Sequence, residues 1–155
     1  MSTPFLKNPA DIRCALTAAA LLLALLFSDT VLNAYMAATT AHPFAAGFCK
    51  FAVLATFGEC LAQRMLRGRY LPEGFGLVPR AVIWGALGVC ITVAFTIFSA
   101  GAPQLLAALG LDWAPGALAG PLGGHKLATA FAVSLTMNTM FAPVLMVAHK
   151  IGDLH

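Results

Sequence analysis

Polar side chains lie inside long apolar stretches of this sequence, and their spacing indicates what chemistry they could do. Thr56, Glu59 and Gln63 are three and four residues apart, so on a helix they share one face. Such a face could form the polar wall of a path for a solute or a proton. Alternatively, Glu59 makes a structural bond to Arg64, to Arg67 or to a polar atom of a neighbouring helix. Both interpretations stay open.

A second polar group joins two consecutive apolar segments. Asp29 and Asn33 are four residues apart and share a helix face, while Lys50 lies about two turns into the next segment. The short turn between the segments makes them antiparallel neighbours. An ion pair of Asp29 with Lys50 would avoid an unpaired charge at depth, which costs at least ~2.5–3.5 kcal/mol on insertion scales. The alternative is that Lys50 extends to the outer membrane surface.

The last apolar segment contains an amide and a proline. Asn138 lies near its middle, where an amide needs a partner on another helix. Pro143 removes a backbone hydrogen bond and predicts a kink that frees carbonyls around Thr139. A polar residue beside a kink can line a pore, but it more often joins helices.

Motifs for metal, cofactor or covalent chemistry are missing from the sequence. The four cysteines have no Cys-x-x-Cys spacing, which indicates neither a zinc site nor a dithiol redox site. His42, His125 and His149 fall at predicted helix ends or in connections, whereas a haem between helices needs facing histidines in mid-span. No nucleophile elbow, zinc-protease helix or phosphate loop occurs. We predict no enzyme, metal or cofactor, with a haem-binding redox subunit as an alternative.

The composition decides which elements carry these residues. Of 155 residues, 60% are hydrophobic and 10% charged, against roughly 25% charged in a soluble domain. The run from Ala81 to Leu111 has no charged residue at all. Since about 20 apolar residues span a bilayer core, these numbers exclude a soluble enzyme, a nucleic-acid-binding module and a disulfide scaffold.

The sequence therefore predicts an all-α, polytopic membrane protein forming a single membrane domain over residues 1–155. Its four transmembrane helices are expected at about 14–38, 44–63, 81–100 and 127–148. Small residues at 81, 85, 88 and 92 predict a close-packing face on the third. Residues 101–126 are rich in Gly and Pro and are expected to form an interfacial or re-entrant segment. There Pro103 starts a short helix over 104–109 that Gly110 ends, and Trp113 lies at the headgroup level.

Basic residues predict the orientation. Lys7 and Arg13 precede the first helix, four arginines follow the second and Lys150 follows the fourth, whereas the opposite side has only Lys126. Both termini are thus expected on the cytoplasmic or matrix side of a bacterial inner membrane or an organelle membrane. A cleaved signal peptide is the alternative for the first 38 residues. The lack of a close small-x-small cleavage site favours a retained helix.

Several short motifs occur in a familiar order. His42-Pro43-Phe44 is followed by Gly58-Glu59 and Gln63, then by Gly85 and Gly88 after Arg80, and then by Phe141-Ala142-Pro143. Over about residues 41–148, this pattern resembles the peroxisomal and mitochondrial inner-membrane protein family, the Mpv-seventeen family. The resemblance implies channel-like behaviour or membrane homeostasis, with Glu59, Gln63 and Asn138 as the inherited polar positions.

Departures from the family pattern fit a divergent, bacterial or truncated member. Glu59 replaces an Asp, and Met137-Asn138 stands where the family has Asp-Gln. The Gly-Pro and Trp-Tyr residues of the family's second helix are missing. The family's last helix, with a Trp-Pro motif, has no counterpart before His155, and the helix over 14–38 would be an N-terminal addition.

Two functional hypotheses follow. The first is a pore for small solutes or ions, formed by a homo-oligomer because four thin helices leave little room for an internal path. The second is a non-catalytic structural or assembly subunit of a larger membrane complex, in which the polar residues only join helices. Both expect the lipid bilayer as partner and no nucleic acid.

The composition makes a direct prediction. After cell lysis and ultracentrifugation, the protein is expected in the membrane pellet and should enter solution only with detergent, because its charged residues are too few to cover a water-facing surface. Immunoblotting of pellet and supernatant measures this. A monodisperse, detergent-free protein in the supernatant would contradict the whole interpretation.

Overall fold

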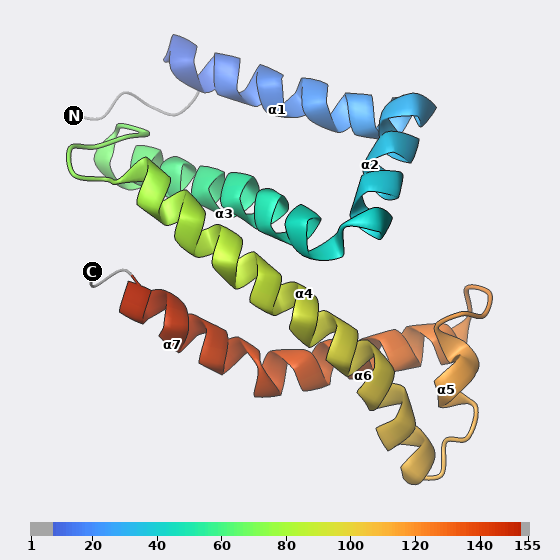
Figure 1. Cartoon of the computed structure of the whole chain (residues 1–155). Coiled ribbons are helices and arrows are strands. Elements are labelled where there is room, and N and C mark those ends of the chain that lie inside the picture. Colours follow the sequence, from blue (N-terminus) through green and yellow to red (C-terminus); the bar gives the residue numbers. More distant parts are fainter. Residues whose placement is uncertain (1–7, 153–155) are drawn as a thin grey trace. The chain divides into compact units, whose positions relative to one another are not determined.

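The computed structural model describes residues 8–152, and these form helices and turns with no strand (Figure 1). The predicted all-α class is confirmed for this part of the chain. The helices are α1 Pro9–Phe27, α2 Asp29–Ala41, α3 Pro43–Arg67, α4 Leu77–Ala108, α5 Ala114–Ala117, α6 Gly124–Met140 and α7 Ala142–Gly152.

The described residues divide into two compact units. The first ends at Gly85 and contains α1, α2, α3 and the first turns of α4. The second begins at Ala86 and contains the remainder of α4 with α5, α6 and α7. The boundary thus falls inside a continuous helix.

Ser28 divides the first predicted span, so the continuous helix expected over 14–38 is wrong. Ser28 has an extended backbone (φ −115°, ψ 103°), and its side chain accepts a 3.4 Å hydrogen bond from the backbone N–H of Val31. Serine at such a position satisfies an N–H that would otherwise lack an acceptor. Asp29 then places a negative charge in the first turn of α2, where the helix dipole favours it.

The start of α1 is also earlier than predicted. Asn8 caps this helix, because its Oδ1 accepts a 2.9 Å hydrogen bond from Ala10 N–H, and Pro9 occupies the first helical position. Proline fits there since its missing N–H has no intrahelical acceptor to lose. As a result Asp11 lies inside the helix rather than in a terminal flank.

In the first unit, α2 leads from the end of α1 to the start of α3, which runs back toward the start of α1 (Figure 1). Helix α3 begins at Pro43 and ends where Gly68 adopts the left-handed conformation with φ 74°. Glycine favours this conformation, which terminates helices. Helix α3 therefore continues to Arg67, four residues beyond the predicted end.

Helix α4 is longer than predicted and continues through Pro103. The expected separate helix over 104–109 is therefore wrong. A proline inside a helix removes one backbone N–H donor, whereas a break in the helix would leave several backbone groups without hydrogen bonds in an apolar segment. The predicted role of Gly110 as terminator is confirmed. With φ 92°, Gly110 donates a hydrogen bond to Ala107 O (2.9 Å), and Leu111 donates one to Leu106 O (3.0 Å), which is a Schellman motif.

The last apolar segment consists of two helices. Helices α6 and α7 are bent by 44° at a break at Phe141, and Pro143 is the second residue of α7. The missing proline N–H leaves a gap in the helical hydrogen bonds at the position where the sequence predicts a kink. Between α4 and α6, the Gly- and Pro-rich segment forms turns and the four-residue α5.

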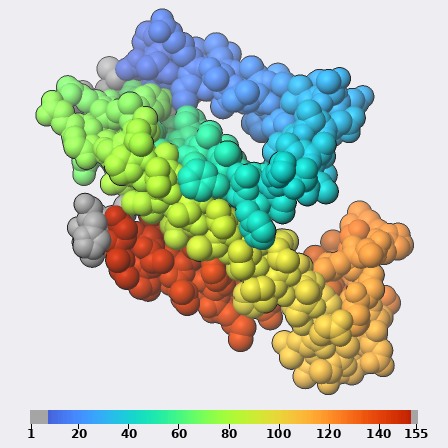
Figure 2. All heavy atoms as spheres, viewed as in Figure 1, coloured from blue at the N-terminus to red at the C-terminus, as the bar shows by residue number. Residues whose placement is uncertain are grey.

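Three helices are long and apolar enough to cross a membrane, namely α1, α3 and α4, and the bent pair α6–α7 would make a fourth span. Most large apolar side chains of the described residues are exposed, and few are buried. Figure 2 shows α1 and α2 largely uncovered on the face in view. An exposed apolar surface of this extent indicates association with a membrane.

The Phe48 ring of α3 lies against Gly85 of α4. A Cβ atom placed on Gly85 would lie 2.5 Å from two atoms of the Phe48 ring, so a side chain at this position requires the ring to move. The predicted close-packing face is confirmed at this residue. By contrast, a Cβ on Gly58 of α3 would meet no atom within 4 Å.

This difference between two glycines predicts opposite effects on stability. Gly85→Leu is expected to lower the unfolding free energy by about 1–3 kcal/mol through overpacking against Phe48. Gly58→Ala should raise it by roughly 0.5–1 kcal/mol, because alanine favours the helix. Thermal unfolding in detergent measures both, and adding Phe48→Ala to Gly85→Leu should recover part of the loss. Equal stabilities for Gly85→Leu and wild type would contradict the close contact.

Candidate functional site

The candidate site is the inward face of α3, where polar residues recur at helical spacing. Thr56, Cys60 and Arg64 are buried, and Glu59 and Gln63 are partly buried. The spacings of three and four residues place all five on one side of the helix. We call these five residues the α3 polar face.

Glu59 bonds to the neighbouring helix α4. Its Oε2 accepts a 2.6 Å hydrogen bond from Arg80 Nη1, and its Oε1 accepts a 2.8 Å hydrogen bond from Trp84 Nε1. Arg80 is itself oriented by a 2.8 Å bond from Nε to Phe75 O, with its guanidinium 4.8 Å from the centre of the Phe75 ring. A bond from Glu59 to a neighbouring helix, one of the partners expected for it, is therefore present.

Arg64 forms a buried ion pair with Asp11 of α1. Its Nε and Nη2 donate to the two carboxylate oxygens of Asp11 at 2.8 and 2.6 Å. The side chains of Arg64 and Asp11 are 3% and 0% exposed. Two parallel charge-assisted bonds fix both direction and distance. The pair therefore ties the end of α3 to the start of α1.

Tyr70, in the turn after α3, completes this cluster. Its hydroxyl donates a 2.9 Å hydrogen bond to Asp11 Oδ1. Burial, and next the bond to Asp11, raise the pKa of Tyr70 above its usual value of 10.0. The phenol therefore remains a donor at neutral pH. Its contribution to stability is complete below the usual pKa and is lost only as the pH rises through the higher folded-state pKa.

Sequence reasoning missed Asp11, because the predicted helix began at residue 14. Two signals could have found it. Asn8-Pro9 is a helix start, which would have placed Asp11 in the first turn. The positive-inside rule also placed the start of the first helix and the end of the second on the same side of the membrane. This placement brings Asp11 near Arg64.

Two oxygens of the α3 polar face have no hydrogen-bond partner among the described residues. They are Oγ1 of Thr56 and Oε1 of Gln63, and both atoms are buried. Buried polar atoms in native proteins are nearly always paired, so such atoms indicate water or another bound species. These oxygens lie on either side of Glu59 along the helix.

The other predicted polar residues lie elsewhere. Asp29 and Asn33 are exposed on α2, and Lys50 is exposed on α3. Within residues 8–152, no ion pair joins Asp29 to Lys50. The break at Ser28 is the physical reason, since Asp29 begins a new helix instead of extending the first one.

Asn138 is satisfied within its own helix. Its Nδ2 donates to the carbonyl oxygen of Ser134 at 2.8 Å and to the Ser134 hydroxyl at 3.3 Å. The side chain is exposed. An amide bonded one turn back needs no partner on another helix, so the expected interhelical bond is not formed within the described residues.

Metal-ligating side chains do not gather in the part of the chain that the structure describes. No three His, Cys, Asp or Glu side chains there lie close enough to hold a metal ion. The four cysteines are free thiols.

Comparison with protein-family models, curated proteins and solved structures finds no match to this chain. The resemblance to the peroxisomal and mitochondrial inner-membrane protein family therefore stays a prediction.

The Asp11–Arg64 pair predicts strong coupling between two positions 53 residues apart. Asp11→Asn or Arg64→Met alone should lower the thermal unfolding temperature, because each leaves a buried charge without its partner. The double variant should lose less stability than the sum of the losses in the two single variants, because it contains neither charge. Thermal unfolding in detergent measures the four proteins.

Arg67→Met serves as the matched control, because Arg67 is exposed at the end of the same helix. Additive losses in the double variant would show that Asp11 and Arg64 act independently and would contradict the pair.

Proposed function

We propose that this protein is a non-enzymatic integral membrane protein that contributes the α3 polar face to a passage for small solutes or ions. The observation that carries the proposal is the pair of buried, unpartnered oxygens on Thr56 and Gln63. In an apolar surrounding, an unsatisfied polar atom is costly, and water or a polar solute passing along α3 would satisfy it.

Glu59 supplies the charge in this proposal. It lies between Thr56 and Gln63 in sequence, and its side chain is 19% exposed while that of Arg80 is 29% exposed. A partly exposed ion pair at membrane depth is a usual feature of solute and ion pathways. Glu59 would then join α3 to α4 and also set the electrostatic potential beside the passage.

The proposed membrane arrangement has four spans, α1, α3, α4 and the bent pair α6–α7. Both termini would face the cytoplasm or the matrix, and the segment between α4 and α6 would lie at the outer surface. Since many large apolar side chains of the four spans are exposed, further copies of the chain are the proposed source of the remaining passage wall.

A flux assay tests the proposal. The full chain is reconstituted into liposomes, and efflux of potassium and of a small neutral solute is measured. Thr56→Val and Gln63→Leu should each reduce neutral-solute efflux severalfold, because they remove the oxygens that the solute would contact. Glu59→Gln should reduce potassium efflux more than neutral-solute efflux, because it removes the negative charge.

Thr96→Val is the matched control, since Thr96 is an exposed threonine of α4 that bonds to Thr92 O in its own helix. Its efflux should equal that of the wild type. Wild-type efflux no greater than that of protein-free liposomes would refute the passage.

A structural or assembly subunit is the second candidate, and a specific observation favours it. Both carboxylates of the first unit's ion pairs are bonded to other elements, Asp11 to Arg64 and Glu59 to Arg80. Polar groups used in this way join helices. This candidate expects no efflux and co-purification with a larger membrane complex in mild detergent.

A further inference from the structure

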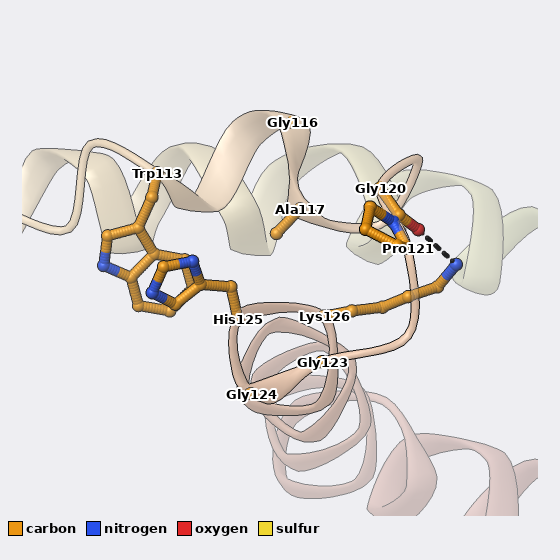
Figure 3. A pocket seen from close by; sticks show the side chains of 9 residues that line it. All are labelled: Trp113, Gly116, Ala117, Gly120, Pro121, Gly123, Gly124, His125 and Lys126. Atoms are coloured by element: carbon orange, nitrogen blue, oxygen red, sulfur yellow. Dashed lines mark hydrogen bonds between the residues drawn. The ribbon is translucent and has the colours of Figure 1, made fainter.

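A cavity of about 430 Å³ lies in the second unit, between α5, the following turn and the start of α6 (Figure 3). Nothing in the α3 polar face involves this cavity. Its volume falls within the ~300–1,000 Å³ range of small-molecule sites. All its lining residues come from residues 113–126, so the site belongs to one short stretch of chain.

An aromatic pair forms one wall of the cavity. The rings of Trp113 and His125 are stacked, with centroids 4.2 Å apart and planes inclined by 15° (Figure 3). This contact holds the segment before α5 against the first turn of α6. It gives the cavity a flat aromatic surface.

Lys126 forms the opposite side. Its Nζ donates a 2.9 Å hydrogen bond to Gly120 O, which directs the ammonium group across the turn (Figure 3). An ammonium group has three donors, so Lys126 retains two for a ligand. No acidic side chain lines the cavity, and the adjacent Asp112 lies outside its lining.

Backbone donors add to this positive character. Helix α6 begins at Gly124 without a side-chain cap, and its first backbone hydrogen bond runs from Leu127 N to Gly123 O. The N–H groups of the three preceding residues therefore have no acceptor within the helix. They lie at the edge of a cavity that already has a lysine and no carboxylate, and N–H groups at a helix start favour anions.

We propose that this cavity binds the phosphate group of an anionic phosphate ester. Lys126 and the free N–H groups of α6 would bind the phosphate oxygens, and the Trp113–His125 pair would contact the less polar part of the ester. A phospholipid headgroup and a soluble phosphate ester share this chemistry. The site neither requires nor implies a passage along α3.

Fluorescence titration tests the site in the full chain in a neutral detergent. Trp113 reports on the cavity wall, while Trp84, bonded to Glu59, provides a constant signal. The probes are inorganic phosphate, glycerol 3-phosphate, and short-chain phosphatidylglycerol and phosphatidylcholine. A saturable change with a phosphate ester is expected, and Lys126→Gln should weaken binding roughly tenfold.

Two further variants separate the ligand from the fold. Ala117→Leu keeps every charge and the bond to Gly120 but fills the cavity, because the Ala117 side chain points into it (Figure 3). It should weaken binding as Lys126→Gln does. Lys150→Gln, in exposed α7 of the same unit, should bind like the wild type.

The probes also identify the source of the phosphate. Binding of phosphatidylglycerol far above that of glycerol 3-phosphate supports a lipid headgroup, and the reverse order supports a soluble ester. Failure of all phosphate probes to change the fluorescence would overturn the proposal. So would binding that both Lys126→Gln and Ala117→Leu leave unchanged.

Discussion

A charge that is buried or partly buried on an apolar helix needs a partner within the protein, and α3 meets this constraint twice. Glu59 bonds to Arg80 and Trp84 of α4, and Arg64 bonds to Asp11 of α1. One helix therefore carries a member of each ion pair, with opposite signs, five residues apart. These bonds have the directionality that a set of exposed apolar side chains lacks, so they determine how α1 and the first turns of α4 join α3.

Both units contain hydroxyl groups that bond within their own helix, but the side-chain bonds between elements distant in sequence lie in the first unit. In the first unit, the carboxylates of Asp11 and Glu59 accept hydrogen bonds from two arginines and a phenol that are distant from them in sequence. In the second, hydroxyl and amide groups bond to carbonyls three or four residues back in the same helix, at Thr92, Thr136, Asn138 and Thr139. Local bonds of this kind leave these parts of the helix surface free to contact lipid or other helices, because the bonded hydroxyl and amide groups already have partners.

The two proposals use the groups that these bonds leave over. On α3, the unpartnered oxygens of Thr56 and Gln63 are neutral and can accept hydrogen bonds, and the Thr56 hydroxyl can also donate one. Such groups beside an ion pair suit water or a neutral solute. Between α5 and α6, the remaining groups are donors, namely a lysine and the first N–H groups of a helix. Acceptors and donors of this kind favour different ligands, so the two sites are chemically independent.

The sequence by itself determined the helical class, the apolar segments and the positions of several helix ends, because these depend on local composition and on residues such as Pro43 and Gly110. It placed Thr56, Glu59 and Gln63 on one face, since helical spacing alone decides that. Only the tertiary structure decided that Glu59 bonds to α4, that Asp11 reaches Arg64, and that Asp29 and Lys50 stay apart. Partner choice depends on which helices lie side by side and on breaks such as that at Ser28, and neither follows from the spacing of residues within one helix.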